Sequence, residues 1–539
     1  MGSVAARTDG IGGEIRAGRL CGEADMNRRD FLIRSGVAGL GLGALSGCTS
    51  TAERRRAPRR PNIVYLLADQ LRYQSCGYAG DGTACTPNLD RLAREGVSFR
   101  QAVSSMPVCS AYRASLFTGK YTTGTGMVIN ELRMNPNQTC LGHVLTGAGY
   151  ETGYIGKWHL YANELGNHIE PRNSFVPRGP HRLGFDGYWA AFNFHHDYYG
   201  AYYHTESPEK IFYGEGVFEP DAQTDMAIDF LSQKASDEAP FFLMVSYGTP
   251  HDPWASNNVP AQYYRLFKDV TFPPAPNYSS EMDPYGDEWS NIEKSPRQID
   301  EWMRNYYAMT ANLDWNIGRI LDAVDKAGLA DDTLIVFTSD HGEMFGGHGR
   351  MKKNIFYEEA ARIPFLMRWK GQIPAGSVSD ACLNTPDIMP TLLGLAGLHS
   401  RIPEAVEGMD LSHLARGRSG PEPQAALLVN TGACALWQDG HEWRALRDKR
   451  FTYAVFRGGG SKNLPRKEVL FDHVADPLQR KDLAGDPAYR TRMEKYRDML
   501  KARMAELNDR FPASTWYRDH WTDGHRRITA SATGPFGAG

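Results

Sequence analysis

The chain has 539 residues, of which 41% are hydrophobic and 23% are charged, and its formal net charge at pH 7 is -3. This length and composition predict a soluble protein of enzyme size with a large hydrophobic core. The chain has no basic excess, which argues against a nucleic-acid-binding protein, so we expect no nucleic acid partner.

The first 48 residues differ in kind from the rest of the chain. Twin arginines, Arg28 and Arg29, precede a short stretch rich in glycine, alanine and leucine that ends in Leu-Ser-Gly-Cys48. This pattern indicates a twin-arginine export signal, and the stretch is too short and too rich in glycine for a membrane-spanning helix. We expect residues 1–48 to be a lipoprotein leader and Cys48 to be lipidated. The mature protein would then be periplasmic or on the cell surface, with the outer membrane favoured, and would contact the membrane only through its lipid anchor.

Residues 49–60 are basic and end in proline, so we expect a solvated tether before the folded part. The folded part opens with a continuous apolar run at 62–68, similar runs follow at 241–247 and 333–339, and a weaker strand is expected at 150–155. Runs of this length are typical of parallel strands that are covered on both faces. Helical patterns separate them, at 87–96 after the Thr-Pro start signal and at 309–326. Strands that alternate with helices predict an α/β domain around a largely parallel sheet.

Chemically reactive side chains follow four of the predicted strands. They are Asp69-Gln70, Lys157-Trp158-His159, His251 and Asp340-His341. Ligands of open α/β sheets bind beyond the carboxyl ends of the strands, so these side chains are expected to converge. Singly, each has an ordinary structural explanation, such as a helix cap or a buried histidine. Together they indicate a metal-assisted anion site.

The composition and the pattern of predicted elements change after residue 398. Glycine, proline and short strand-like pieces at 443–446 and 451–456 replace the long helical units, and an amphipathic helix is predicted at 489–507. We therefore expect a catalytic domain at 61–415, a smaller α+β subdomain at 416–525 and a flexible tail at 526–539.

The segment 107–120, PVCSAYRASLFTGK, is the most informative motif. It resembles the signature of the type I sulfatases, a family of the alkaline phosphatase-like superfamily, in which the cysteine is oxidised after translation to formylglycine. The cysteine here is Cys109. The family usually has proline two residues later, where this chain has Ala111. Arg113, at i+4 on a helix, would lie on the same face as residue 109 and steady the hydrated aldehyde.

The resemblance extends from residue 61 to about residue 484. It implies a large mixed sheet flanked by helices, with a smaller C-terminal subdomain of a short antiparallel sheet and a helix. The implied metal ligands are Asp69, Gln70, Cys109, Asp340 and His341, and the implied catalytic residues are Cys109, Arg113, Lys157, His159, His251 and Lys353. Hard cations prefer oxygen ligands, so Ca²⁺ is the favoured metal. The imidazole of His341 is also compatible with Mn²⁺ or Zn²⁺.

The family chemistry gives these residues their expected roles. Hydrated formylglycine attacks sulfur with one hydroxyl in the presence of a divalent metal, and the other hydroxyl later expels sulfate. Lys157 and Lys353 would neutralise the sulfate oxygens, although the adjacent Lys352 leaves a one-residue ambiguity. His159 would take a proton from the hydrated aldehyde, and His251 would contact sulfate and protonate the leaving oxygen.

The resemblance implies a sulfuric ester hydrolase that removes O-sulfate from a sulfated carbohydrate. Its expected partners are a sulfated oligo- or polysaccharide substrate and a formylglycine-generating enzyme during maturation. Two alternatives stay open. One is a phosphonate monoester or phosphodiester hydrolase of the same superfamily, which Gln70 and His341 favour. The other is an inactive sulfoglycan-binding protein in which Cys109 remains a thiol because of Ala111.

Two features have both a functional and a structural interpretation. The segment 185–218 is crowded with aromatic residues and histidines, which either stack on sugar rings or pack a loop against the main domain. His348 lies near Lys353 in a glycine-rich stretch, and it either shares the acid role or is a solvated loop histidine.

Overall fold

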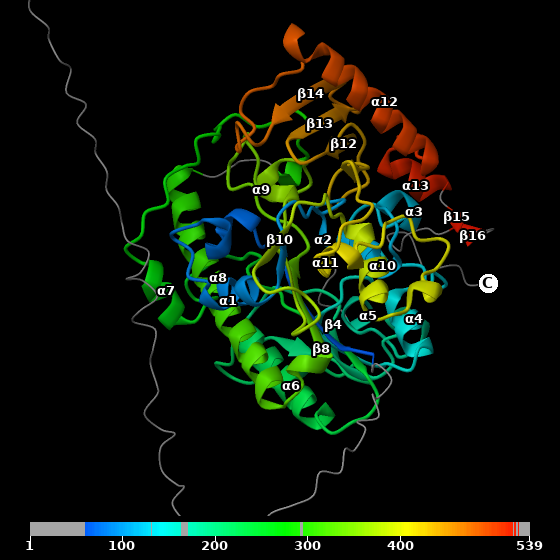
Figure 1. Ribbon diagram of the computed structural model, residues 1–539. Coiled ribbons are helices and arrows are strands. Elements are labelled where there is room, and N and C mark those ends of the chain that lie inside the picture. Colours follow the sequence, from blue (N-terminus) through cyan, green and yellow to red (C-terminus); the bar gives the residue numbers. More distant parts are fainter. Residues whose placement is uncertain are drawn as a thin grey trace, which may run out of the picture.

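The computed structural model describes residues 60–130, 132–162, 171–290, 295–520, 522–523 and 526–527. The expected leader, nearly all of the expected tether and most of the expected tail lie outside the described residues. An eight-stranded sheet forms the centre of the molecule, with the strand order β10-β2-β9-β8-β1-β7-β3-β4 (Figure 1). Its strands are β1 (Asn62–Ala68), β2 (Val97–Phe99), β3 (Glu151–Lys157), β4 (Tyr188–Phe192), β7 (Phe241–Ser246), β8 (Thr333–Ser339), β9 (Phe365–Arg368) and β10 (Ser377–Ser379).

Five adjacent strands of this sheet run parallel, which confirms the largely parallel arrangement expected from the sequence. β1 pairs with β7 on one side and with β8 on the other, and β3 and β4 continue beyond β7. β9 is antiparallel to both β8 and β2, so the whole sheet is mixed. Every residue of β1, β7 and β8 is buried, because the sheet is covered on both faces, and their sequences are therefore continuous apolar runs.

Successive side chains of β1 enter two separate hydrophobic cores, since neighbouring residues of a strand point to opposite faces. The helices that cover the sheet are α1 (Pro87–Glu95), α2 (Cys109–Thr118), α6 (Glu219–Lys234), α8 (Pro296–Lys326) and α10 (Thr385–Leu395). Tyr65 and Leu67 pack with residues of α2 and α10 on one face. Val64 and Leu66 pack with residues of α1, α6 and α8 on the other. The main domain thus has three layers, helix, sheet and helix.

Helix α8 begins 13 residues before the start that the sequence predicted, since its first residue is Pro296 rather than 309. Its N-terminus has a capping hydrogen bond from the Gln298 N–H to Ser295 Oγ and proline at the first position. Residues 296–304 are mostly exposed or half-buried, so the hydrophobic periodicity that identifies a helix is weak there. Among the described residues, no helix is both long and apolar enough to cross a membrane.

A second sheet forms the C-terminal subdomain that the sequence predicted (Figure 1). Its antiparallel strands are β11 (Ala426–Asn430), β12 (Trp443–Arg447), β13 (Phe451–Phe456) and β14 (Lys467–Asp472). One face packs against helix α12 (Arg490–Glu506), where Tyr453 meets Tyr496. The other face packs against residues 355–361 of the main domain, where Phe356 meets Trp443. The subdomain therefore rests directly on the segment that follows Lys353.

The remaining α-helices and strands of the described residues are short. They are α3 (Thr122–Thr125), α4 (Leu141–Gly147), α5 (Pro171–Ser174), α7 (Ala261–Phe267), α9 (Glu358–Ala361), α11 (Ser412–Ala415) and α13 (Ser514–His520), with the two-stranded pairs β5 (Tyr202–Tyr203) with β6 (Ile211–Phe212) and β15 (Thr522–Asp523) with β16 (Arg526–Arg527).

Candidate active site

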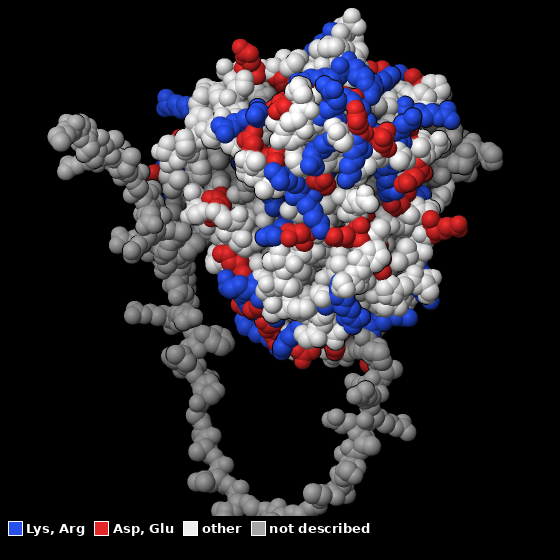
Figure 2. Space-filling view, turned by 45° about the horizontal axis from the view of Figure 1, so that its top comes forward, with Lys and Arg blue, Asp and Glu red and all other residues white. Residues whose placement is uncertain are grey.

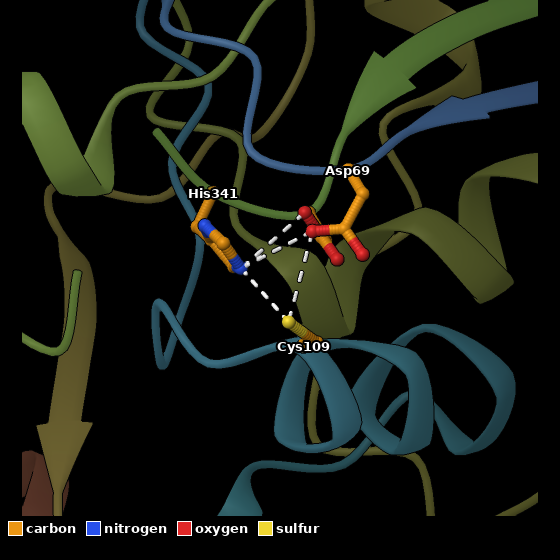
Figure 3. Close-up of side chains that lie close together, drawn as sticks. Asp69, Cys109 and His341 are labelled. Carbon is orange, nitrogen blue, oxygen red and sulfur yellow. Dashed lines mark hydrogen bonds and ion pairs between the residues drawn. The ribbon is translucent and has the colours of Figure 1, made fainter. Parts of the chain in front are cut away.

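Cys109 is the first residue of helix α2 and is fully buried. Its predecessor Val108 is extended, so the chain turns into the helix at the cysteine. The thiol Sγ lies 3.1 Å from Nε2 of His341 and 3.7 Å from Oδ1 of Asp69 (Figure 3). Ala111, at the place where the family usually has proline, is buried among apolar residues of the C-terminal subdomain interface. The motif thus presents Cys109 to side chains from the sheet.

Four side chains form a candidate metal site at the carboxyl ends of β1 and β8. Asp69, Cys109, Asp340 and His341 each offer a ligand atom, and these atoms all lie within 4.8 Å of one another. All four residues are buried. Asp69 and Asp340 follow adjacent parallel strands, so the register of the sheet brings their carboxylates together. The convergence that the strand ends predicted is confirmed.

The tautomer of His341 suits a metal ligand. Its Nδ1 lies 3.0 Å from the Gly342 carbonyl oxygen, which only accepts hydrogen bonds, so Nδ1 carries the proton. Nε2 is then an unprotonated nitrogen that faces Asp69 and Cys109. Burial and the nearby charge of Lys353 lower the pKa of His341, which keeps the imidazole neutral. Metal-bound histidines are commonly neutral imidazoles whose other ring nitrogen donates a hydrogen bond to a carbonyl oxygen.

The two carboxylates of the cluster differ in their pKa values. Burial opposes ionisation of Asp69, but the positive charges of Lys157 and Arg113 hold its pKa below the usual range. Burial and the neighbouring Asp69 charge raise the pKa of Asp340 to about 6. A bound cation would favour the ionised form of both groups.

Lys157 and Arg113 surround the carboxylates, and both are fully buried. Lys157 Nζ contacts Asp69 Oδ2, while Arg113 Nη2 lies 3.4 Å from Asp340 Oδ2 and 3.6 Å from Asp69 Oδ2. Arg113 is fixed by hydrogen bonds from Nη1 to the Lys157 carbonyl and to Ser246 Oγ, both 2.7 Å long. The i+4 spacing therefore places Arg113 against the carboxylates of the cluster.

Gln70 connects the cluster to Lys353. Its backbone N–H donates to Asp340 Oδ1 at 3.0 Å, and its Oε1 accepts from Lys353 Nζ at 2.7 Å. Lys353 Nζ also lies 2.9 Å from His251 Nε2. Gln70 has a positive φ of 67°, a conformation that non-glycine residues adopt mainly where the surroundings enforce it. The side chain of Gln70 is thus oriented between the cluster and the lysine.

The two candidate acid–base histidines lie beside the two candidate sulfate-binding lysines. His251 Nδ1 is 2.9 Å from the Asp252 carbonyl oxygen and therefore carries the proton, so its Nε2 accepts from Lys353. His159 is buried, and its ring centroid is 4.4 Å from that of Phe194, which also lies 4.6 Å from Lys157 Nζ.

Several candidates outside this set have structural contacts instead. His348 stacks on Tyr357 at 3.8 Å, and its Nε2 contacts the Leu478 carbonyl, so it joins the subdomains together. Most aromatic residues of 185–218 pack the loop, as Tyr198 does through hydrogen bonds to the carbonyls of residues 248 and 251. His196 is an exception, because its ring stacks on His251 at 3.9 Å.

Glu343 is a site residue that the sequence analysis missed. This buried carboxylate accepts hydrogen bonds from Gln70 Nε2 at 2.8 Å and from the Lys352 N–H at 2.6 Å. It therefore holds both the amide of Gln70 and the backbone before Lys353. Its position, two residues after His341, was a signal that could have identified it.

The three-layer main domain, the small antiparallel sheet and the buried cluster at the strand ends define a protein of the alkaline phosphatase-like superfamily. The family model described as Sulfatase matches residues 61–398, and the one described as N-sulphoglucosamine sulphohydrolase, C-terminal, matches residues 346–509. The chain belongs to the sulfatase family and is a sulfatase enzyme.

Similar proteins of known name support this assignment. An ulvan-active sulfatase of Formosa agariphila is 37% identical over 87% of this chain and 85% of its own length. An endo-4-O-sulfatase of Bacteroides thetaiotaomicron is 29% identical over 90% of this chain and 98% of its own. A solved structure from work on glycosaminoglycan metabolism by Bacteroides thetaiotaomicron is 27% identical, with a TM-score of 0.72, and covers 86% of this chain and 98% of the other.

Proposed function

We propose that this sulfatase removes O-sulfate from a sulfated carbohydrate of oligo- or polysaccharide size. The observation that carries the proposal is the buried cluster of Asp69, Cys109, Asp340 and His341, bordered by lysines and an arginine. Relatives that act on sulfated carbohydrates support the substrate class, among them the ulvan-active sulfatase, the endo-4-O-sulfatase and an N-acetylglucosamine-6-O-sulfatase of Bacteroides thetaiotaomicron.

We further propose that Cys109 is oxidised to formylglycine by a formylglycine-generating enzyme. Both hydroxyl oxygens of the hydrated aldehyde would be bonded to Cβ of residue 109, and Sγ of Cys109 marks the region beside Asp69 and His341 that one of these oxygens would occupy. The hydrated aldehyde supplies a hydroxyl nucleophile and a second hydroxyl that allows release of sulfate. The basic groups around residue 109 suit an anionic substrate, because Arg113, Lys157 and Lys353 are buried at this position.

The donor set fits a divalent cation. Asp69 and Asp340 offer carboxylate oxygens, His341 offers an unprotonated Nε2, and residue 109 would offer a further oxygen. Oxygen donors favour Ca²⁺, whereas the imidazole also suits Mn²⁺ or Zn²⁺. When bound, the cation would lower the pKa of a ligated hydroxyl and neutralise charge on the sulfate.

The remaining residues have roles that follow from their contacts. Lys157 contacts Asp69 and Lys353 contacts Gln70, and both lysines would hold the sulfate oxygens. His251 Nε2 accepts a hydrogen bond from the Lys353 ammonium, so the pair of His251 and Lys353 would supply the proton for the leaving oxygen. His159, buried beside Phe194, is the candidate acceptor for the proton of the nucleophile.

The experiment is peptide mass spectrometry of residue 109 combined with a substrate panel. Protein made together with a converting enzyme should contain formylglycine at position 109 and should hydrolyse sulfated sugars and aryl sulfates faster than aryl phosphonates. Cys109→Ala should lose essentially all activity, whereas the buried Cys382→Ala is the control for loss of a thiol.

Two results would contradict parts of this proposal. An unmodified thiol in fully active enzyme excludes the formylglycine chemistry, and a preference for phosphonates favours the alternative hydrolase. Chelator-treated enzyme should lose activity and regain it with Ca²⁺, so full activity after metal removal excludes the cation from the reaction.

A further inference from the structure

Two aromatic rings lie against the lysines of the site, and they differ in exposure. The Phe194 centroid is 4.6 Å from Lys157 Nζ, and the Trp289 centroid is 5.1 Å from Lys353 Nζ. Phe194 also packs against His159 and is only partly exposed. Trp289, by contrast, is 39% exposed. A large part of the indole beside Lys353 is therefore available to a ligand.

The backbone that carries Trp289 is anchored on both sides. Trp289 lies in the 3₁₀ helix η4 (Glu288–Ser290), and the flanking residues Asp287 and Ser290 are 1% exposed. The Ser290 N–H donates to Asp287 Oδ1 at 2.8 Å, and the Met351 N–H donates to the Ser290 carbonyl at 3.0 Å. Asp287 Oδ2 also accepts from the Cys434 N–H at 2.6 Å. These bonds fix the backbone at Trp289 relative to the segment that contains Lys353.

Two ammonium groups lie next to the same indole. Lys352 Nζ is 5.5 Å from the Trp289 centroid and is held by an ion pair with Asp252 at 2.7 Å, while Lys353 Nζ contacts His251. Single exposed hydrophobic residues are common on protein surfaces and need no function. An anchored indole beside the sulfate-binding lysine combines the two features that a sulfated sugar requires, namely an apolar face for the ring and cations for the anion.

We propose that Trp289 is the stacking platform for a pyranose ring of the sulfated substrate, next to the sulfate held by Lys353. The inference rests on the proposed function, because it assigns a sugar-binding role to the mouth of that same site. Trp289 was absent from the residues expected from the sequence, since it lies outside the aromatic segment 185–218.

The test compares Trp289→Ala and Trp289→Phe with the control Trp315→Ala. Trp315 is a matched control, because this tryptophan of α8 is 43% exposed and has the Arg319 guanidinium 4.7 Å from its ring. For the best sulfated oligosaccharide of the panel, Trp289→Ala should raise KM about tenfold with little change in kcat. Trp289→Phe should stay within about threefold of the wild type, because it keeps an aromatic face. Trp315→Ala should match the wild type.

Inorganic sulfate distinguishes stacking from positioning of Lys353. As a competitive inhibitor it occupies the anion site but has no ring, so its inhibition constant should change less than about twofold in Trp289→Ala. An unchanged KM in Trp289→Ala overturns the inference. So does an equal rise in the oligosaccharide KM and the sulfate inhibition constant, which would mean that Trp289 only positions the lysine.

Calorimetric binding of the same oligosaccharide to unmodified protein separates this inference from the proposed function. A Kd that rises about tenfold in Trp289→Ala supports the stacking platform, whether or not the wild type hydrolyses a sulfate ester. Failure of the modified wild type to hydrolyse any sulfate ester refutes only the proposed function. Absence of binding to the wild type overturns the platform as well.

Discussion

Lys352 and Lys353 are neighbours in the sequence, but their ammonium groups have different partners. Lys353 contacts Gln70 and His251, whereas Lys352 pairs with Asp252. We expect Lys353→Met to lower kcat/KM by about 100- to 1000-fold, because a buried cation that faces the reacting charge is lost. Lys352→Met should cost at most about tenfold, since it removes a partly exposed ion pair. Steady-state hydrolysis of a sulfate ester measures both, and equal losses would contradict the assignment of Lys353.

The sequence predicted those site residues that directly follow a recognisable strand or belong to the Cys109 motif. Asp69 and Asp340 could be predicted in this way, because the carboxyl ends of parallel strands meet at one edge of the sheet. Trp289 could not be predicted from the sequence in this way. Its position beside Lys353 depends on hydrogen bonds between segments about 60 residues apart and on a further contact from the C-terminal subdomain. Local patterns do not encode such long-range contacts.

Helix α9 is connected to strand β12 by a buried ion pair. Arg447 Nε and Nη2 donate to the two carboxylate oxygens of Glu358 at 2.6 and 2.9 Å, and both side chains are at most 3% exposed. Glu358→Gln leaves the guanidinium without its charge partner, so we expect a loss of about 3–5 kcal/mol in stability. Thermal unfolding measures the change. The control Glu422→Gln, which breaks an exposed pair with Lys449, should cost about 1 kcal/mol or less.

The same pair predicts a pH dependence. Burial opposes ionisation of Glu358, but the Arg447 charge outweighs it and holds the pKa below the usual range. The pair therefore stabilises the fold above about pH 4.3, the ordinary pKa of glutamate, and this contribution is lost as the pH falls toward the lowered pKa. Below about pH 4 the Tm of the wild type should fall more steeply than that of Glu358→Gln. Parallel curves would contradict the assignment.

Elements with a continuous apolar pattern were predicted well, as β1, β8 and β13 show, because burial on both faces leaves a clear signal. The first part of α8 was missed because it is only partly buried. The two-stranded pair β5 and β6 was also missed, since strands of two residues carry no periodicity.

The location of the whole molecule is a prediction that depends on residues 1–59, which lie outside the described residues. If Cys48 is lipidated after twin-arginine export, the wild type should fractionate with membranes, and Cys48→Ala should be released. Replacing both Arg28 and Arg29 by lysine should retain the uncleaved precursor inside the cell. Fractionation with mass spectrometry of the mature N-terminus measures these outcomes. A soluble wild type that starts at another residue would contradict the lipoprotein assignment.

The burial of Cys109 has a consequence for the order of events during synthesis. The thiol is fully buried, and Ala111 of the same turn packs with Leu427 of β11, which leaves the ribosome more than 300 residues later. At about 5–20 residues per second, this delay is roughly 15–60 s. If Cys109 is oxidised to formylglycine as proposed, the enzyme that oxidises it has its best access in that interval, before β11 is synthesised. The fraction of protein modified at residue 109 would then depend on the rate of translation and on the supply of converting enzyme.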